Sequence, residues 1–496
     1  MNLIHIDDYI RILPELVLTA FGLAVMILDP LLPAGKSRRS LGILSLVGTL
    51  AAMGAAFYQL GDYGLRARTG WFGMVRVDSF SIFFHILIPA IAAVCILASL
   101  EYLDQQNIKS GEYYGLILFG TVGMVLMSSA IELVLIFIAL EISSISTYIL
   151  AGYRRRTAIG SESSIKYFLL GSFATAFFLY GVALMFGATG STTIPDIAKA
   201  LHQGAVISQA LVYAAVALML IGLGFKVAFA PFHVWTPDVY EGAPAPVVAF
   251  MSTGPKAAAF AVLLRVLFGA GTSGWFWLIW IAAALSMTLG NLGALVQNNV
   301  KRMLAYSSIA HAGYLLVAFA AGNELGRTAV IFYTAAYAAM NVGAFAVVSH
   351  ISTSGERYVS IDDYAGLGRR SPLLAFTLTI FMLSLIGIPL TGGFFAKYYV
   401  FSAALKANLI GLTIIGLVNS AVAAYYYLRL IVVMYMREPA VEGAPEPVTP
   451  AMSMALVLAA LATIYLGVAP SQVVDYATVG AQEVSSQAPA SVARGN

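Results

Sequence analysis

Long apolar stretches alternate with short polar connections along the chain, and this pattern predicts the fold. The hydrocarbon core of a bilayer is about 30 Å thick and an α-helix rises about 1.5 Å per residue, so a spanning helix needs roughly 20 apolar residues. Stretches of about this length recur from residue 10 to residue 470. Because lipid offers no partner to the backbone polar groups, we expect each stretch to be a helix.

We predict an all-α polytopic membrane protein with about fourteen transmembrane helices, of which the twelfth is long and interrupted. The first stretch follows Asp7 and Asp8 and has no basic leader, so we expect a retained helix and no signal peptide. The longest connections are 60–76, 352–372 and 437–449, and we expect the tail 471–496 to be disordered. The predicted spans are 10–29, 40–59, 77–99, 113–130, 131–151, 164–187, 207–231, 246–268, 275–296, 302–321, 326–350, 373–405, 409–436 and 450–470.

Composition supports a membrane location and excludes several functions. Charged residues make up 10% of the 496 residues and hydrophobic residues 60%, whereas soluble domains contain roughly 25% charged residues. The net charge of +3 is spread over many loops, so no basic tract is available for nucleic acid. The single cysteine, Cys95, cannot hold an iron–sulfur cluster or form an internal disulfide. The connections are too short for a nucleotide or flavin domain.

Loop charges predict the orientation in the membrane. Thirteen basic residues fall on one side and seven on the other, or nine with the helix-end residues Arg11 and Arg265. The positive-inside rule places the richer side in the cytoplasm, so an even number of spans puts both termini outside. The richer side carries Lys36, Arg38, Arg39, Lys109, Arg154, Arg155, Arg156, Lys301, Arg302, Arg357, Arg369, Arg370 and Arg437, and the other Arg66, Arg68, Arg76, Lys199, Arg327, Lys406 and Arg494.

Ionisable residues inside the predicted spans are the strongest functional signal. A charged group at the bilayer centre costs at least about 2.5–3.5 kcal/mol on insertion scales, so several such groups in one chain indicate an ion or proton path. The candidates are Glu141, Lys166, Lys226, Lys256, Lys397, Arg429, His233 and His311.

Structural explanations compete with this one. Lys166 and Arg429 lie where their side chains could snorkel to an interface. His311 could be a neutral core histidine, and His233 could cap backbone groups freed by Pro231. For the remaining four residues the alternative is a static buried ion pair, but three lysines cannot all be neutralised by Glu141 alone.

Two predicted spans are broken by proline close to a lysine. Pro231 follows Lys226 by five residues, and Pro389 precedes Lys397 by eight. Such paired broken helices are typical of inverted-repeat transporters. Five helices separate the two spans, and an odd number of helices per repeat inverts the second copy. We therefore expect an N-terminal three-helix segment (1–112), two inverted five-helix repeats (113–270 and 271–436) and a last helix with the tail (437–496).

The stretch from Phe225 to Pro246, which includes PFHVWTPDVYEGAPAP, resembles the antiporter-like membrane subunits of respiratory complex I, the proton-pumping NADH:quinone oxidoreductase, and among them the subunit N group. The stretch from Lys301 to Tyr314 (KRMLAYSSIAHAGY) and the Leu140-Glu141-Ile142 segment match the same family. The resemblance covers essentially the whole chain. Subunit L carries a long lateral helix for which this chain has no room, and subunit M is expected to have a glutamate in place of Lys397.

The resemblance implies a fourteen-helix bundle with a proton path along the midplane. It implies that Glu141 pairs with Lys226, that Lys256 connects the two halves and that Lys397 serves the second half-channel. His233 and His311 would link the path, with Lys166 a further candidate. The redox centres of the family (FMN and iron–sulfur clusters) and its quinone site lie in partner subunits, which include neighbouring antiporter-like subunits. The implied location is the bacterial inner membrane.

Physical chemistry favours the same function. Burial disfavours the charged form of a lysine and a nearby carboxylate favours it, so movement of Glu141 relative to Lys226 would drive a proton on or off the lysine. The leading hypothesis is a proton-translocating subunit without redox centres. The alternatives are a subunit of a multi-subunit cation/proton antiporter and, third, a structural membrane anchor, which would leave the central lysines unexplained.

Overall fold

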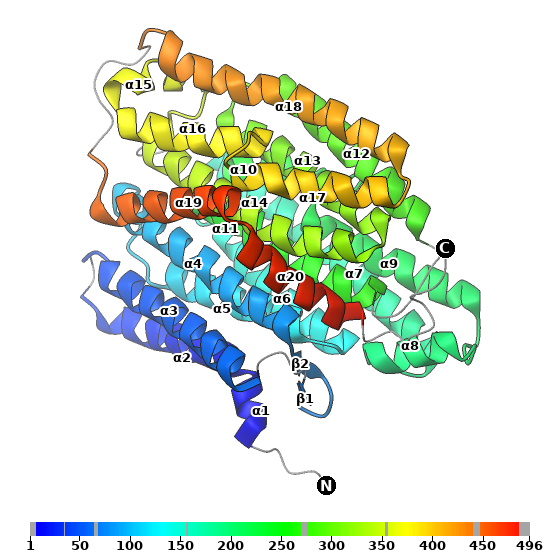
Figure 1. The fold of residues 1–496 in the computed structure, drawn as a ribbon. Helices are drawn as coiled ribbons and strands as arrows, with labels where there is room; N and C mark the ends of the chain where they lie inside the picture. Colours follow the sequence, from blue (N-terminus) through cyan, green and yellow to red (C-terminus); the bar gives the residue numbers. More distant parts are fainter. Residues whose placement is uncertain are drawn as a thin grey trace.

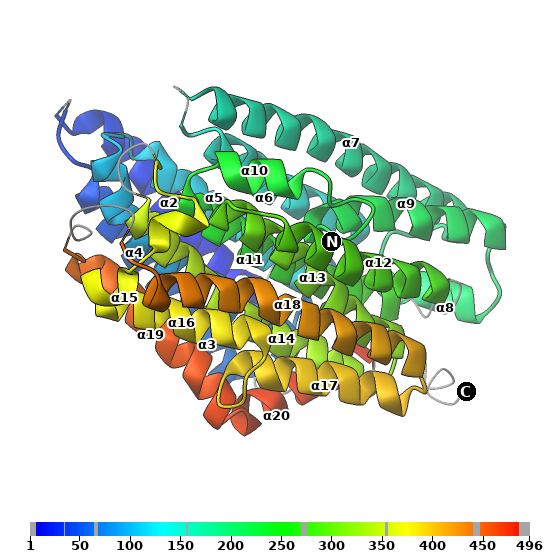
Figure 2. The same ribbon diagram turned by 90° about the horizontal axis from the view of Figure 1, so that it is seen from above.

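The computed structural model describes residues 6–33, 35–63, 68–154, 157–268, 275–352, 356–439 and 447–485. Figures 1 and 2 show long helices that run side by side through the whole molecule, with their connections gathered at the two ends. Among the described residues, twelve helices are long and apolar enough to cross a membrane. Two further passes are the shorter α5 and the broken helix formed by α16 and α17, and together these give the fourteen spans that the sequence predicts.

The N-terminal part consists of three spanning helices and a small hairpin. Its strands β1 and β2 pair antiparallel, with Arg68 opposite Val77 and Gly70 opposite Val75. The sequence pattern predicts only a connection here. The turn between the strands places Trp71 and Phe72 at positive φ. The elements are α1 (Ile6–Arg11), α2 (Leu13–Leu28), η1 (Asp29–Leu31), α3 (Arg39–Tyr63), β1 (Arg68–Gly70), β2 (Val75–Val77) and α4 (Ser79–Gln105).

The middle of the chain forms the expected first group of five spans. Its seventh span breaks after α9, where Ala228 adopts a left-handed conformation with φ 61°, and the chain resumes in the short helix α10. The break lies at Pro231, as predicted. The elements are α5 (Glu112–Ser129), α6 (Leu133–Ala151), α7 (Ala158–Thr189), α8 (Ile194–His202), α9 (Gln209–Val227), α10 (Thr236–Gly242), α11 (Ala245–Leu263) and the π-helical turn η2 (Leu264–Phe268).

The second group of five spans repeats this plan. Its twelfth span breaks between α16 and α17, where Gly387 has a φ of 95° and Leu390 a φ of 72°, so the predicted interruption at Pro389 is confirmed. The elements are α12 (Phe276–Leu295), α13 (Val300–Ala321), α14 (Glu324–Ile351), η3 (Ile361–Tyr364), α15 (Leu367–Arg370), α16 (Pro372–Ile386), α17 (Gly392–Lys406), α18 (Ile410–Met436), α19 (Pro450–Val468) and α20 (Ser471–Ser485).

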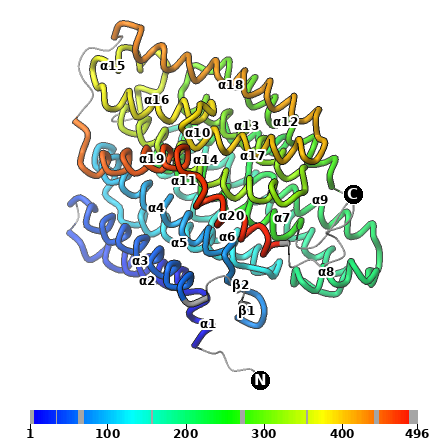
Figure 3. Tube along the Cα trace, in the orientation of Figure 1, coloured from blue at the N-terminus to red at the C-terminus, as the bar shows by residue number. Residues whose placement is uncertain are grey.

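The expected disorder of the tail is wrong for residues 471–485. They form α20, which packs on α14 and α4 and is seen at the red end of the tube in Figure 3. Glu483 of this helix accepts a hydrogen bond from the backbone N–H of Ser79 at 2.6 Å, so it caps the start of α4. The composition of the tail is polar, but α14 and α4 provide a surface against which these residues pack as a helix. Residues 486–496 lie outside the described part.

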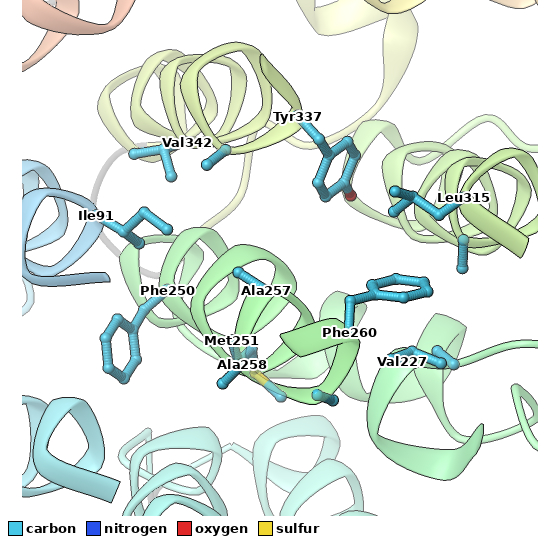
Figure 4. Close-up of a cluster of buried hydrophobic side chains, with 14 of the residues drawn as sticks. Ile91, Val227, Phe250, Met251, Ala257, Ala258, Phe260, Leu315, Tyr337 and Val342 are labelled. Atoms are coloured by element: carbon cyan, nitrogen blue, oxygen red, sulfur yellow. The ribbon is translucent and has the colours of Figure 1, made fainter. Parts of the chain in front are cut away.

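The core is centred on α11. Every residue of this helix is buried, whereas α7 exposes apolar side chains such as Phe173 and Tyr180. Figure 4 shows Ala257 and Phe260 of α11 packed between side chains of neighbouring helices, with Tyr337 pointing from α14 into the same core. A helix that is buried on all sides lies inside the bundle, and one with an exposed apolar face contacts lipid.

Candidate functional site

Lys226 lies in the last turn of α9, directly before the break in the seventh span. Its side chain is buried, and its ammonium donates a hydrogen bond to the Ser144 hydroxyl of α6 at 2.8 Å. The aromatic rings of Tyr148 and Tyr167 lie 5.7 and 5.9 Å from the nitrogen, within the range of a cation–π contact. The amine is therefore held by neutral groups.

Glu141 lies one turn before Ser144 on the same helix and is half-buried. No ion pair within 4 Å joins it to Lys226 in the described part of the chain, and its Oε1 atom is buried without a hydrogen-bond partner there. The carboxylate acts on the Lys226 ammonium through space. Ser144, and not Glu141, is the direct partner of this lysine.

Lys256 lies in the middle of α11 and reaches α13. Its ammonium donates to the Ser308 carbonyl oxygen at 2.6 Å and to the Ser308 hydroxyl at 2.5 Å. Tyr337 of α14 donates to the same hydroxyl at 2.8 Å, and its ring lies 5.6 Å from the ammonium. Lys256 thus joins the central helix of the first group of spans to the second group.

His311 lies one turn beyond Ser307 and Ser308 on α13. Its Nδ1 is 2.7 Å from the Tyr333 hydroxyl, and its Nε2 is 3.4 Å from the Tyr427 hydroxyl. Tyr427 is in turn hydrogen-bonded to Ser307. Hydroxyl groups accept and donate, so this buried cluster can pass a proton along its members when their O–H bonds rotate.

Lys397 lies in α17, two turns after the break in the twelfth span. Its ammonium donates to the Ile386 carbonyl oxygen at 2.7 Å and to the Ser420 hydroxyl at 2.8 Å. Ile386 ends α16, and the last carbonyls of a helix have no partner inside the helix. The break therefore supplies an acceptor for the buried amine. The Tyr314 ring lies 4.9 Å from the same nitrogen.

His233 and Lys166 lie apart from these three lysines. His233 is half-buried in the broken segment, its backbone carbonyl accepts from the Thr236 N–H at 2.9 Å, and its Nδ1 has no partner among the described residues. Lys166 is 40% exposed and forms ion pairs with Glu162 at 2.7 Å and Asp238 at 2.6 Å. Its surroundings are those of a surface ion pair.

Asp238 belongs to a charged cluster at the ends of α7, α10 and α13. Burial would raise the pKa of this carboxyl group, but hydrogen bonds from Lys166 and Arg302 outweigh it and lower the pKa below its ordinary value. Arg302 also pairs with Glu241 at 2.7 Å. Arg429, the remaining candidate, donates to Asn298 at 2.8 Å and braces the start of α13.

The sequence pattern missed a buried ion cluster around Glu356. Lys301 counted as a loop charge, yet its side chain is fully buried and donates to Glu356 at 2.6 Å and to the Ala243 carbonyl oxygen at 2.6 Å. Arg154 pairs with the same carboxylate at 2.9 Å. The cluster ties the start of α13 to the chain just before α11. Serine and tyrosine partners of the lysines were also missed, because these residues are common in helices and carry no signal of their own.

The described residues contain no group of three or more His, Cys, Asp or Glu side chains arranged to hold a metal ion. The arrangement can instead store and release protons: three buried amines, each bound by hydroxyl or carbonyl oxygens, lie at two helix breaks and at the centre of the bundle. None of the three is in an ion pair within the described part.

Comparison with known proteins agrees with this arrangement. A sequence profile described as "NADH:quinone oxidoreductase/Mrp antiporter, TM" matches residues 130–423. NADH-quinone oxidoreductase subunit N 2 of Koribacter versatilis is 64% identical over 480 residues, which cover 96% of this chain and 97% of that protein. A chain of respiratory complex I from Thermus thermophilus, solved with bound aureothin, has a TM-score of 0.80 and 39% identity and covers 93% of this chain and 98% of its own length.

A chain of the Mrp complex from Dietzia superposes with a TM-score of 0.83 over 96% of this chain and 97% of its own, but it is only 20% identical and shows a common fold alone. The high identity over the full length therefore decides between the two groups that the profile includes. The chain is a multi-pass membrane-arm subunit of bacterial complex I, and it belongs to the subunit N family of NADH-quinone oxidoreductase.

Proposed function

We propose that this subunit carries protons across the membrane along the row Lys226, Lys256 and Lys397, with Glu141 as the group that controls the first lysine. The observation that supports the proposal is the bonding of the three amines. Each is buried and each donates to a hydroxyl or carbonyl oxygen. Burial disfavours the charged form of a lysine, and a carboxylate partner would be needed to stabilise that form. A buried amine without such a partner can therefore lose its proton.

Proton movement between the lysines would use the hydroxyl groups around them. Ser308 binds Lys256, and its neighbour in sequence, Ser307, binds Tyr427, which contacts His311. From there the Tyr314 ring, which contacts both His311 and Lys397, leads to the second break. His311 is the relay in this proposal. His233 would act from the first break, and Lys166 has at most an electrostatic influence because its charge is already compensated.

The subunit would work without a redox centre of its own. The family assignment makes it part of a quinone reductase, and we propose that NADH oxidation and quinone reduction take place in partner subunits. The alternative, a subunit of a multi-subunit cation/proton antiporter, shares the fold and the sequence profile, but the 64% identity over 480 residues favours complex I. Copurification with flavin and iron–sulfur signals distinguishes the two.

We further propose that both termini face the periplasm. Twelve basic residues on the opposite side, without the buried Lys301, against seven to nine on this one support that orientation. Reporter fusions to Asn496 that are active only in the cytoplasm would contradict it.

The test of the lysine row compares two changes at one position. Lys226→Ala removes the titrating amine, and Lys226→Arg keeps a charge that does not dissociate near neutrality. If Lys226 exchanges protons, both variants lose NADH-driven pumping by about 10²-fold or more, the usual contribution of a positioned proton-transfer group. If the residue only pairs charges, Arg restores most of the activity. Lys36, in the connection before α3, is the control and tolerates both changes.

The measurement is NADH-driven proton pumping and quinone reduction in membranes, with subunit content checked by blotting. Full pumping in an assembled Lys226→Ala complex would remove this lysine from the path.

A further inference from the structure

A second pair of buried ionisable groups lies outside the lysine row, in the N-terminal three-helix part. Glu15 is near the start of α2 and His85 near the start of α4, both at the end of the bundle that carries the β1–β2 hairpin. Both side chains are buried. The Nε2 atom of His85 lies 3.8 Å from Oε1 of Glu15. This Nε2 makes no hydrogen bond of ordinary geometry among the described residues, and the backbone of Val125 is the other polar group that acts on the imidazole.

The tautomer of His85 follows from its other neighbour. Gln59 of α3 donates its amide N–H groups to the carbonyl oxygens of Ile10 at 2.8 Å and Arg11 at 3.1 Å. These two bonds fix the orientation of the amide, because its oxygen must then point the other way. That oxygen lies 3.0 Å from Nδ1 of His85, so Nδ1 carries a hydrogen. In the neutral ring Nε2 therefore presents a lone pair to Glu15.

The carboxyl group of Glu15 is equally short of donors. Its Oε1 receives one long hydrogen bond, from the Ser129 hydroxyl at 3.4 Å, and its Oε2 has no partner among the described residues. Two lone pairs thus face each other in a buried site. Such an arrangement is costly unless a proton lies between the two atoms, either on the carboxyl group or on the imidazole.

We propose that Glu15 and His85 form a proton-binding pair that takes up and releases one proton during turnover, at the end of the bundle that carries the N-terminus. The ligand of this site is the proton itself. At 3.8 Å the atoms are farther apart than in an ordinary hydrogen bond, so the proton is not locked between them. The existence of the pair does not depend on the lysine row, but its exchange during turnover rests on the proposed function.

A second Glu–His pair on the same helix α4 shows what a permanently satisfied pair looks like. Glu101 accepts from Nδ1 of His350 at 2.9 Å and from Gln105 at 2.9 Å on one oxygen, and from Thr449 at 2.6 Å on the other. Three donors satisfy this carboxylate. It needs no additional proton, so Glu101 is the matched control for Glu15.

Fixed charges close to Glu15 and His85 influence the affinity of this pair for a proton. Asp78, which caps α4, forms an ion pair with Arg265 of η2 at 2.8 Å and lies 3.3 Å from Arg76 of β2. Glu483 of α20 binds the N–H of Ser79 beside them. On the other side, Arg11 pairs with Asp8. Asp78, Arg265 and Arg11 each have an oppositely charged partner and Glu483 accepts from a backbone N–H, whereas Glu15 and His85 have no charged partner within 4 Å other than each other among the described residues.

The test is infrared difference spectroscopy of the intact, purified complex, NADH-reduced minus oxidised, in H₂O and in D₂O. We expect carboxyl and imidazole bands that shift in D₂O, that disappear in Glu15→Gln, and that also disappear in His85→Asn, because the two facing lone pairs that favour the added proton need both partners. Glu101→Gln should leave these bands in place. If Glu15→Gln fails to assemble, His85→Asn against Glu101→Gln still decides the question.

Three results would overturn the pair: no D₂O-sensitive bands assignable to it, bands lost in only one of the two variants, or the same loss in Glu101→Gln. The lysine row is tested separately by pumping. If Lys226→Ala pumps fully and the bands are present, the proposed proton path through the lysines is refuted and the Glu15–His85 proposal stands. If Lys226→Ala loses pumping and the wild type shows no such bands, the Glu15–His85 proposal is refuted and the proposed proton path through the lysines stands.

Discussion

The two groups of five spans place a lysine at a broken helix in each half, yet the two lysines are held differently. An offset of 171 residues relates Lys226 to Lys397, and an offset of 164 relates the Ser-Ser-Ile segment at Ser144 to that at Ser308. Strict repetition would give Lys397 the hydroxyl of Ser308. Lys256 occupies that hydroxyl instead, and Lys397 donates to Ser420 and to the Ile386 carbonyl oxygen.

The two halves also differ in the residue that precedes the serine. Glu141 stands three residues before Ser144, whereas Ala305 stands three residues before Ser308. The first lysine is therefore next to a carboxylate in the first half, and the second is held by the fixed dipole of a helix end. The same backbone plan thus gives one lysine with an acidic residue three positions before its serine partner and one lysine bound to a helix end. Lys256 uses the serine of the second half to link the two.

The largest expected effect of breaking this asymmetry is at Glu141. Glu141→Gln removes the through-space attraction for the Lys226 ammonium, worth about 2–4 kcal/mol for unit charges 4–8 Å apart at an effective dielectric near 20. We expect NADH-driven pumping to fall by about tenfold or more, since 1.4 kcal/mol corresponds to about tenfold. Proton pumping per NADH oxidised is the measurement.

Glu162→Gln is the matched control for Glu141, because Glu162 is 62% exposed and pairs only at the surface of α7. It should leave pumping unchanged. Wild-type pumping in Glu141→Gln would mean that the acid has no part in the first half and that the two halves work alike.

A smaller effect is expected from the serines, and it should be unequal. Ser144→Ala removes the one hydrogen bond that the described residues give Lys226, whereas Ser420→Ala leaves Lys397 its bond to the Ile386 carbonyl oxygen. A hydrogen bond to a charged group contributes about 1.5–3 kcal/mol. We expect Ser144→Ala to shift the pH profile of pumping more than Ser420→Ala.

Ser146→Ala is the control on the same helix, because within the described part of the chain the Ser146 hydroxyl bonds only to the backbone oxygen of Ile142. Equal shifts in Ser144→Ala and Ser420→Ala would show that the helix break adds nothing to the binding of Lys397.

The sequence was sufficient for the spans, for the breaks at Pro231 and Pro389, and for the lysines beside them, because length, proline and buried charge are local signals. The hydrogen-bond partners of these lysines could not be predicted in this way, because they are not close in sequence. Ser144, Ser308 and Ser420 come from helices far away in sequence, and nothing in a single serine distinguishes a lysine acceptor from one bonded to its own helix.

Errors had the same cause. Lys301 counted as a loop charge because it follows a polar segment, but packing buries it against Glu356. The polar composition of residues 471–485 indicated disorder, but the bundle provides a surface on which they form a helix. In both places contacts from distant parts of the chain overrode the local pattern.

The smallest effect is expected at Lys166, whose ion pairs are exposed. Lys166→Ala should leave pumping intact and lower the free energy of unfolding only slightly, as for other surface ion pairs. The stabilisation by its partner Asp238 has a defined pH dependence. Hydrogen bonds from Lys166 and Arg302 outweigh burial, which acts in the raising direction, and lower the pKa of Asp238. The contribution is therefore complete above the unfolded-state pKa of about 3.9 and is lost as the pH falls through the folded-state pKa. Thermal unfolding of the wild type and of Asp238→Asn should differ slightly at pH 7 and converge in acid.

Loss of pumping in an assembled Lys166→Ala complex would instead bring this lysine into the path, and the contrast between buried and exposed lysines would no longer separate carriers from surface charges.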